Sequence, residues 1–227
     1  MIKTVVFDLD DTLYDEIDYC KSGFHAVAQA VRQKFPSIPA TRIYNFLWKQ
    51  FNRGNRTKTF NAALSELGVS YDNKIINDLI TVYRNHAPDI KLPSDTKNVL
   101  DQLYRKYSLA LLTDGFLPAQ QLKVKALDIE RYFKCIIYTE QLGREFWKPS
   151  PAGFEKILQD LNTKPQTTAF VADNTEKDFI APNQLGFTTI QITRPARLHA
   201  GPPPKPNSAP QHVIENITQL PPLLEKL

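Results

Sequence analysis

The feature that most constrains the fold is a short apolar stretch that ends in acids. Val5, Val6 and Phe7 follow one another without alternation, as in a strand buried on both faces. Asp8 and Asp10 come next, two residues apart. Grouped carboxylates repel one another and lose hydration unless a cation or a developing reaction charge compensates them. The stretch therefore predicts the ligand-binding edge of an open parallel α/β sheet, with an acidic turn after an edge strand as the alternative.

Composition narrows the class of protein. The chain has 227 residues, 42% of them hydrophobic and 23% charged, which is typical of a soluble globular protein. The net charge of +4 comes without a dense Lys/Arg run, so we expect no nucleic-acid partner. No apolar run reaches membrane-spanning length, so we expect no membrane partner. Cys20 and Cys135 are too few and too far apart for a disulfide framework, which favours a reducing, cytoplasmic location.

The chain separates into a helical insert and an α/β core. Residues 15–93 show helical periodicity and no convincing strand, whereas the later residues alternate between strands and helices. Strands are expected at 109–112, 135–138, 168–172, 188–192 and 212–214, and helices at 95–106, 118–127, 152–161 and 176–185. The pattern predicts a doubly wound, Rossmann-like parallel sheet built from residues 1–14 and 94–227. The proline-rich stretch 195–210 is interpreted as a surface loop, with a recognition segment as the alternative.

Four short segments carry chemically related side chains, and each follows a predicted strand or opens a predicted helix. They supply Asp8 and Asp10, then Thr113 and Asp114, then Lys148, then Asp173 and Asp178. In a parallel sheet these segments converge at one edge. Carboxylate oxygens suit Mg²⁺, and a hydroxyl and an ammonium group suit a phosphate. With the charge of the phosphate neutralised, an aspartate can attack phosphorus and form an acyl-phosphate, while a second acid handles protons.

This ordered set resembles the four motifs of the haloacid dehalogenase superfamily, in the phosphatase branch that has a helical cap after the first motif. The resemblance implies that Asp8 is the nucleophile and a metal ligand. It implies that Asp10 is the general acid/base and binds the metal through its backbone carbonyl. Residues 15–93 would be the cap. The remaining implied roles are phosphate binding by Thr113, Asp114 and Lys148, Mg²⁺ ligation by Asp173, and support of the metal or of Lys148 by Asp178.

Two positions depart from the common pattern of that superfamily. Ala172 stands where many relatives have glycine, and Asp114 stands where asparagine is common. Asp114 adds a negative charge beside the phosphate site. Neither departure removes a required functional group, so the expected mechanism is unchanged.

The expected function is a Mg²⁺-dependent phosphatase that hydrolyses a small phosphorylated metabolite, either a sugar phosphate or a nucleotide, through an aspartyl-phosphate. A phosphomutase uses the same motifs and stays open as an alternative. Dehalogenation is disfavoured because a halide leaves without a proton and needs no acid at Asp10. A phosphonate hydrolase would need a cap lysine, and nothing marks Lys21, Lys49 or Lys58 for that role. A non-catalytic phosphoryl-binding regulatory protein is the alternative outside the enzymes. The sequence does not indicate the oligomeric state.

Overall fold

A computed structural model describes residues 1–227, which divide into two compact units. The core unit comprises Met1–Ile17 and Lys91–Leu227, and the helical unit comprises Asp18–Ile90. The first strand and the start of the first helix belong to the core unit, so the helical unit is inserted into it.

The core unit is built on a six-stranded sheet in the order β3-β2-β1-β4-β5-β6. Every pair of neighbouring strands is parallel. The strands are β1 (Thr4–Phe7), β2 (Ser108–Thr113), β3 (Cys135–Tyr138), β4 (Thr168–Ala172), β5 (Thr188–Ile192) and β6 (His212–Ile214). The chain order reverses at β1, between β2 and β4, and such a reversal places the binding crevice at the carboxyl ends of these strands. The predicted doubly wound parallel sheet is confirmed.

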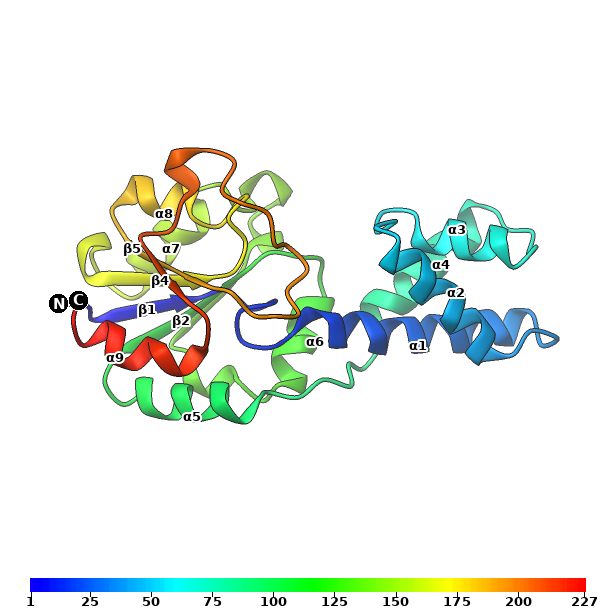
Figure 1. Cartoon of the computed structure of the whole chain (residues 1–227), viewed down its shortest axis with the longest axis horizontal. Coiled ribbons are helices and arrows are strands. Elements are labelled where there is room, and N and C mark those ends of the chain that lie inside the picture. The colour runs from blue at the N-terminus through cyan, green and yellow to red at the C-terminus, as the bar shows by residue number, and fades with distance from the viewer. The chain divides into compact units, whose positions relative to one another are not determined.

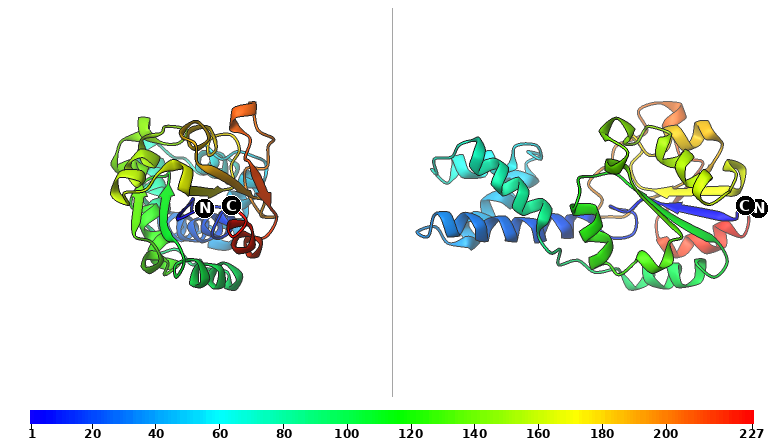
Figure 2. Two further views of the ribbon diagram at one scale, coloured as in Figure 1. Left: turned by 90° about the vertical axis from the view of Figure 1, so that its left-hand side faces the viewer. Right: turned by 180° about the vertical axis from the view of Figure 1, so that it is seen from behind.

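Helices cover both faces of the sheet, with α7 and α8 on one face and α5 and α9 on the other (Figure 1). Figure 2 shows the same two layers of the core unit from the end and from behind. The helices of this unit are α5 (Ser94–Leu103), α6 (Ala119–Ala126), α7 (Ala152–Asp160), α8 (Ile180–Leu185) and α9 (Leu220–Leu224). Single 3₁₀ turns complete it: η1 (Glu130–Tyr132), η2 (Thr139–Gln141), η3 (Arg144–Phe146), η4 (Pro165–Thr167), η5 (Pro206–Ser208) and η6 (Ile217–Gln219).

Aromatic packing joins the sheet to the layer that contains α7 and α8. The Phe154 ring of α7 meets Phe170 of β4 edge-on, with centroids 4.9 Å apart, and meets Phe187 at 5.7 Å. All three rings are buried. Burial of each side chain of this size stabilises the fold by about 1.5–3 kcal/mol. This packing fixes the position of β4, whose carboxyl end carries Asp173.

The start of α8 differs from the sequence-based prediction. The periodicity placed this helix at 176–185, but α8 begins at Ile180. The Asn174 side chain accepts a hydrogen bond from the Glu176 N–H (2.9 Å), and the Asp178 carboxylate accepts one from the Asn174 N–H (3.0 Å). These side-chain bonds hold the backbone in a turn that competes with the first helical turn.

The proline-rich segment 195–210 forms a loop that is anchored to the core unit. The Leu198 N–H donates to Asp11 Oδ2 at 2.6 Å, and the Thr175 hydroxyl donates to the Gly201 carbonyl at 3.0 Å. Residues 199–207 are exposed, whereas Ser208 is buried. The segment is therefore a surface loop with fixed ends, in agreement with the first of its two interpretations.

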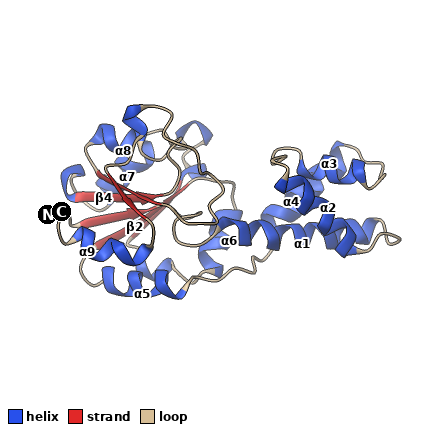
Figure 3. Cartoon of the chain, in the orientation of Figure 1, coloured by secondary structure: helices blue, strands red, loops and turns tan.

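The helical unit contains no strand, as Figure 3 shows by colour. Its helices are α1 (Glu16–Lys34), which starts in the core unit, α2 (Ala40–Asn52), α3 (Thr59–Glu66) and α4 (Asn73–Asn85). Phe24 packs against the rings of Phe51, Phe60 and Tyr83 in its interior. Gly23 makes this packing possible, because a Cβ there would lie 2.3 Å from the Tyr83 ring. The helical periodicity of residues 15–93 therefore corresponds to these four helices.

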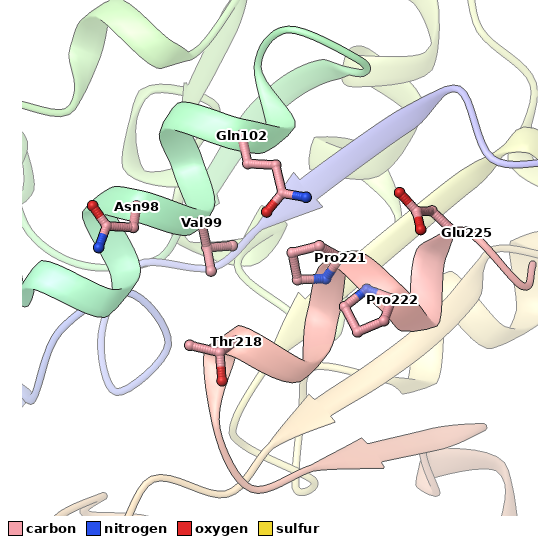
Figure 4. A pocket seen from close by; sticks show the side chains of 7 residues that line it. All are labelled: Asn98, Val99, Gln102, Thr218, Pro221, Pro222 and Glu225. Carbon is pink, nitrogen blue, oxygen red and sulfur yellow. The ribbon is translucent and has the colours of Figure 1, made fainter.

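A surface groove of about 310 Å³ lies between α5 and α9. Figure 4 shows its lining, in which Pro221 and Pro222 face Val99, with Asn98, Gln102, Thr218 and Glu225 around them. None of the residues singled out by the sequence analysis lines this groove.

Candidate active site

Asp8 emerges from the middle strand of the sheet into a buried position. Its backbone N–H donates to the Val171 carbonyl of β4 at 2.9 Å, which continues the strand pairing by one residue. The side chain is 8% exposed. Burial, and then the neighbouring Asp178, raise the pKa of Asp8 to about 6, although Lys148 acts in the opposite direction. Ionisation of the Asp8 carboxyl group therefore depends on cations that lie close to it.

Lys148 supplies the cation that joins two of these acids. Its Nζ lies 2.8 Å from Asp8 Oδ1 and 2.9 Å from Asp178 Oδ1, and all three side chains are buried. Burial disfavours the ammonium, but Asp178 and Asp8 together raise its pKa well above the ordinary value. Lys148 therefore stays charged in the interior.

Asp173 follows β4 and completes a group of three buried carboxylates. Ligand atoms of Asp8, Asp173 and Asp178 all lie within 4.8 Å of one another. The Asp173 backbone is fixed by Gln191 of β5, whose side-chain amide donates to the Asp173 carbonyl at 2.9 Å. Burial and the neighbouring Asp178 and Asp8 raise the pKa of Asp173 to about 9. The three acids therefore carry more negative charge, when ionised, than Lys148 alone compensates.

This group of acids fits a divalent metal ion. The Asp173 Oδ2 atom is buried and has no hydrogen-bond partner, which is costly for a carboxylate oxygen unless a cation binds it. Three oxygen ligands in a compact group are the chemistry that hard cations such as Mg²⁺ prefer. Asp178 belongs to this group of acids and also forms an ion pair with Lys148.

Asp10 lies in a separate set of contacts. Lys123 of α6 donates to both of its carboxylate oxygens at 2.8 Å, and the Tyr14 hydroxyl donates to Oδ1 at 2.5 Å. Gln120 Nε2, also on α6, donates to Oδ2 at 2.9 Å. Burial works to raise the pKa of Asp10, but Lys123 and these hydrogen bonds outweigh it and hold the pKa below the ordinary value. Asp10 is therefore a carboxylate with both oxygens engaged.

Thr113 and Asp114 lie at the end of β2 and are held by different partners. Gln120 Nε2 donates to the Thr113 hydroxyl at 2.6 Å, so one amide links Thr113 to Asp10. Asp114 binds the Lys177 ammonium at 2.8 Å through Oδ2. Its Oδ1 accepts from the Thr139 hydroxyl at 2.9 Å and from the Lys148 N–H at 3.2 Å. The extra negative charge at position 114 is thus compensated within the site.

The structure therefore arranges the predicted residues in two groups, which Asp114 connects. Asp8, Lys148, Asp173 and Asp178 form the buried ionic group, and Asp10 joins Thr113 through Gln120. Asp114 contacts the backbone of Lys148 and thereby connects the end of β2 to the ionic group.

Sequence reasoning missed the residues that hold these groups in place. The most important are Tyr14, Gln120, Lys123, Thr139 and Lys177. Gln120 and Lys123 are three residues apart within the predicted helix 118–127 and therefore share one face. This polar pair was the signal in the sequence that could have predicted their role, because the helix follows the second motif and packs near the predicted acidic edge of the sheet.

Comparison with known proteins identifies the family. The family model for haloacid dehalogenase-like hydrolases matches residues 5–192, and the chain belongs to this family. A glyceraldehyde 3-phosphate phosphatase of Methanocaldococcus jannaschii is 27% identical over 198 residues, covering 86% of each chain. A human N-acylneuraminate-9-phosphatase is 24% identical over 241 residues, covering 100% of this chain and 95% of the relative.

A solved structure supports the fold. The crystal structure of a 2-haloacid dehalogenase from Pseudomonas syringae superposes with a TM-score of 0.68 at 23% identity, covering 100% of this chain and 99% of that one. The predicted membership of the haloacid dehalogenase family, and with it the prediction of an enzyme, is confirmed. The names of the two curated relatives agree with the phosphatase branch. No helix combines the length and the apolar character needed to cross a membrane.

Proposed function

We propose that the protein is a Mg²⁺-dependent phosphatase that hydrolyses a small phosphorylated metabolite through an aspartyl-phosphate at Asp8. The observation that carries the proposal is the buried group of Asp8, Asp173 and Asp178 around Lys148. This group offers a carboxylate nucleophile, an ammonium for the phosphate and oxygen ligands for a cation within one small volume.

Asp8, Asp173 and the backbone carbonyl of Asp10 would hold the metal, with Asp178 beside them. When bound, the divalent cation supplies positive charge that offsets the repulsion between a phosphate dianion and the Asp8 carboxylate. Burial raises the pKa of Asp8 and that of Asp173, and a bound cation would favour their ionised forms.

In the first step an Asp8 carboxylate oxygen attacks phosphorus, and the bond between phosphorus and the ester oxygen breaks. Asp10 in its protonated form gives its proton to the departing alkoxide, and this leaves the carboxylate that Lys123 and the hydrogen bonds of Tyr14 and Gln120 stabilise. Lys148 and the Thr113 hydroxyl bind the phosphoryl oxygens, and the contact between Lys148 Nζ and Asp8 Oδ1 fixes the nucleophile beside them. In the second step Asp10 takes a proton from water, the water oxygen attacks phosphorus, and the bond to Asp8 breaks. Inorganic phosphate leaves and the Asp8 carboxylate is restored.

We assign Asp114 to positioning within the phosphate-binding segment. Both of its oxygens are engaged, one by Lys177 and the other by Thr139 and the Lys148 N–H. A carboxylate in this state does not repel a phosphate as a free one would, because Lys177 neutralises it. Asp114 then holds the backbone of Lys148 while Lys148 binds the phosphate.

The helical unit, Asp18–Ile90, is proposed to be the cap that selects the substrate, in line with the predicted cap bounds of 15–93. The names of the curated relatives specify glyceraldehyde 3-phosphate and N-acylneuraminate 9-phosphate, which favours a sugar-type phosphate over a nucleotide here. The cytoplasmic location remains a prediction.

Phosphate release tests the proposal. The purified protein is assayed on triose, hexose and nonulosonate phosphates, nucleoside monophosphates, an aryl phosphate and a 2-haloacid, with Mg²⁺ and with chelator. Asp8→Asn is the test variant, and Asp160→Asn, which removes an exposed acid of α7, is the matched control. We expect Mg²⁺-dependent release that Asp8→Asn loses and Asp160→Asn keeps. Halide release, or an isomerised product without free phosphate, would instead establish a dehalogenase or a phosphomutase.

A further inference from the structure

Two buried polar side chains of α6 have no place in the four-motif mechanism. Lys123 is 3% exposed and Gln120 is 2% exposed. Burial of an ammonium group is strongly unfavourable unless it is paired and hydrogen-bonded. A hydrophobic side chain at position 123 would pack at less cost, so the presence of lysine there calls for a reason other than stability.

The contacts of Lys123 supply that reason, because they converge on Asp10. The Lys123 ammonium lies 2.8 Å from each Asp10 oxygen, and its second acidic neighbour, Glu16 Oε1, is farther away at 3.8 Å. With Tyr14 on Oδ1 and Gln120 on Oδ2, the Asp10 carboxylate receives four hydrogen bonds. Such a set of donors restricts rotation of the carboxylate much more than one ion pair would.

Gln120 connects this carboxylate to the phosphate-binding segment. Its Nε2 atom lies 2.9 Å from Asp10 Oδ2, 2.6 Å from the Thr113 hydroxyl and 2.8 Å from the Asp114 carbonyl. Gly115, at φ +140°, allows this approach, because a Cβ there would lie 2.8 Å from the Gln120 amide carbon. One helix thus sets the distance between the proton-transferring acid and the hydroxyl assigned to the phosphate.

We propose that Lys123 and Gln120 are positioning residues that fix the Asp10 carboxylate relative to Thr113 for proton transfer to the leaving group. The inference rests on the proposed phosphatase function and adds two residues to it. Both act by holding Asp10 rather than by binding the substrate. Their effect on the rate passes through Asp10, and this distinguishes them from residues that only stabilise the fold.

The dependence of the rate on the leaving group tests the inference. An alkyl phosphate needs a proton on its departing oxygen, whereas the anion of p-nitrophenol leaves without one. We expect Lys123→Met to lower kcat/KM about 10- to 100-fold on the best sugar phosphate, as a displaced acid would. On p-nitrophenyl phosphate the same variant should lose less than about 3-fold, since proton transfer contributes little there. Gln120→Ala should show the same selective loss, and Lys123→Arg, which keeps a cation, should recover part of the rate.

The Asp10→Asn background separates positioning from a general structural effect. If Lys123 acts through Asp10, Lys123→Met added to Asp10→Asn causes no further loss on the sugar phosphate. Equal losses on both substrates, or losses that add in the double variant, would overturn the inference. If Lys123→Met does not fold, Gln120→Ala is compared on the same two substrates and in the same Asp10→Asn background, and the same results support or overturn the inference. Absence of wild-type turnover on every phosphate ester would instead overturn the proposed function, and with it this inference, before any variant is compared.

Discussion

At the scale of residues, the site is a balance between buried acids and a few lysines. Lys148 forms ion pairs with Asp8 and Asp178, Lys123 forms one with Asp10, and Lys177 forms one with Asp114. Each pair contains at least one buried residue, and removal of the residue that pairs with it leaves a charge that water cannot reach. The pairs therefore differ in what a single substitution does, according to which partner is exposed.

The pair of Asp114 and Lys177 gives a directional prediction. The Asp114 side chain is 4% exposed and that of Lys177 is 35% exposed. Lys177→Met leaves a buried carboxylate beside the phosphate site, so we expect a loss of about 2–3 kcal/mol in the free energy of unfolding and a raised KM. Asp114→Asn leaves a lysine that water can still solvate, so its loss should be below about 1 kcal/mol.

The double variant completes this test. Asp114→Asn combined with Lys177→Met removes both charges and should recover most of the stability and of the KM that Lys177→Met loses. Lys164→Met, at an exposed lysine of the same unit, is the matched control. The free energy of unfolding comes from urea titration and KM from phosphate release. Additive losses in the double variant would show that the two side chains do not compensate each other.

At the scale of elements, the sheet positions the site through close packing of α7 on β2. Gly153 faces Leu112, and a Cβ at position 153 would lie 2.5 Å from Leu112 Cδ1. Gly153→Ala therefore forces α7 away from β2 or Leu112 out of its place. We expect a loss of about 1–3 kcal/mol, as for overpacked cores, with a fall in Tm of about 2–4 °C for each kcal/mol.

Gly201→Ala is the matched control for this prediction. Its nearest neighbour would be Glu176 Oε1 at 3.6 Å, an ordinary contact, so the Tm should change little. Both variants are compared by calorimetry in the same buffer. An unchanged Tm for Gly153→Ala would show that α7 and β2 do not constrain each other as described.

The elements were largely predictable because the apolar runs of the strands are unambiguous. Val5, Val6 and Phe7 favour a buried strand over an edge strand, and the acids that follow mark its end. The start of α8 could not be predicted in this way. The side chains of Asn174 and Asp178 accept backbone hydrogen bonds that hold the preceding turn, and the spacing of apolar residues contains no information about such bonds.

The motif residues were predictable for a similar reason, whereas their supports were not. Asp8 and Asp173 follow strands directly, so topology alone brings them together. Lys123 and Lys177 stand on a helix and in a turn, where a lysine is ordinarily solvated. Only the three-dimensional contacts distinguish them from surface residues.

At the scale of the whole molecule, the acids make stability depend on pH and on metal. In the folded state, burial is the main cause that raises the pKa of Asp173 to about 9 and the pKa of Glu16 to about 8. Ordinary carboxyl values in the unfolded chain are about 4, so the folded state holds more protons between these limits. Stability from these groups is fully present below about pH 4 and is lost as pH rises toward 8 to 9.

We therefore expect the metal-free protein to lose thermal stability between about pH 5.5 and 8.5, and Mg²⁺ to restore more of it at the higher pH. A penalty of one pKa unit is about 1.4 kcal/mol and would shift the Tm by about 3–5 °C. Thermal unfolding at several pH values, with Mg²⁺ and with chelator, measures this effect. Asp173→Asn should reduce both the pH dependence and the response to Mg²⁺. A Mg²⁺ increment that stays constant across pH would contradict this assignment of the acids.

The central claim is that Asp8 becomes phosphorylated during turnover, and trapping of the intermediate tests it most directly. The protein is mixed with its best phosphate ester and Mg²⁺, quenched in acid within one turnover, and treated with borohydride, which reduces an acyl-phosphate to an alcohol. Peptide mass spectrometry then locates the reduced residue. We predict reduction at position 8, with none in chelator. Continued phosphate release without reduction at position 8, or reduction at another acid, would contradict the account.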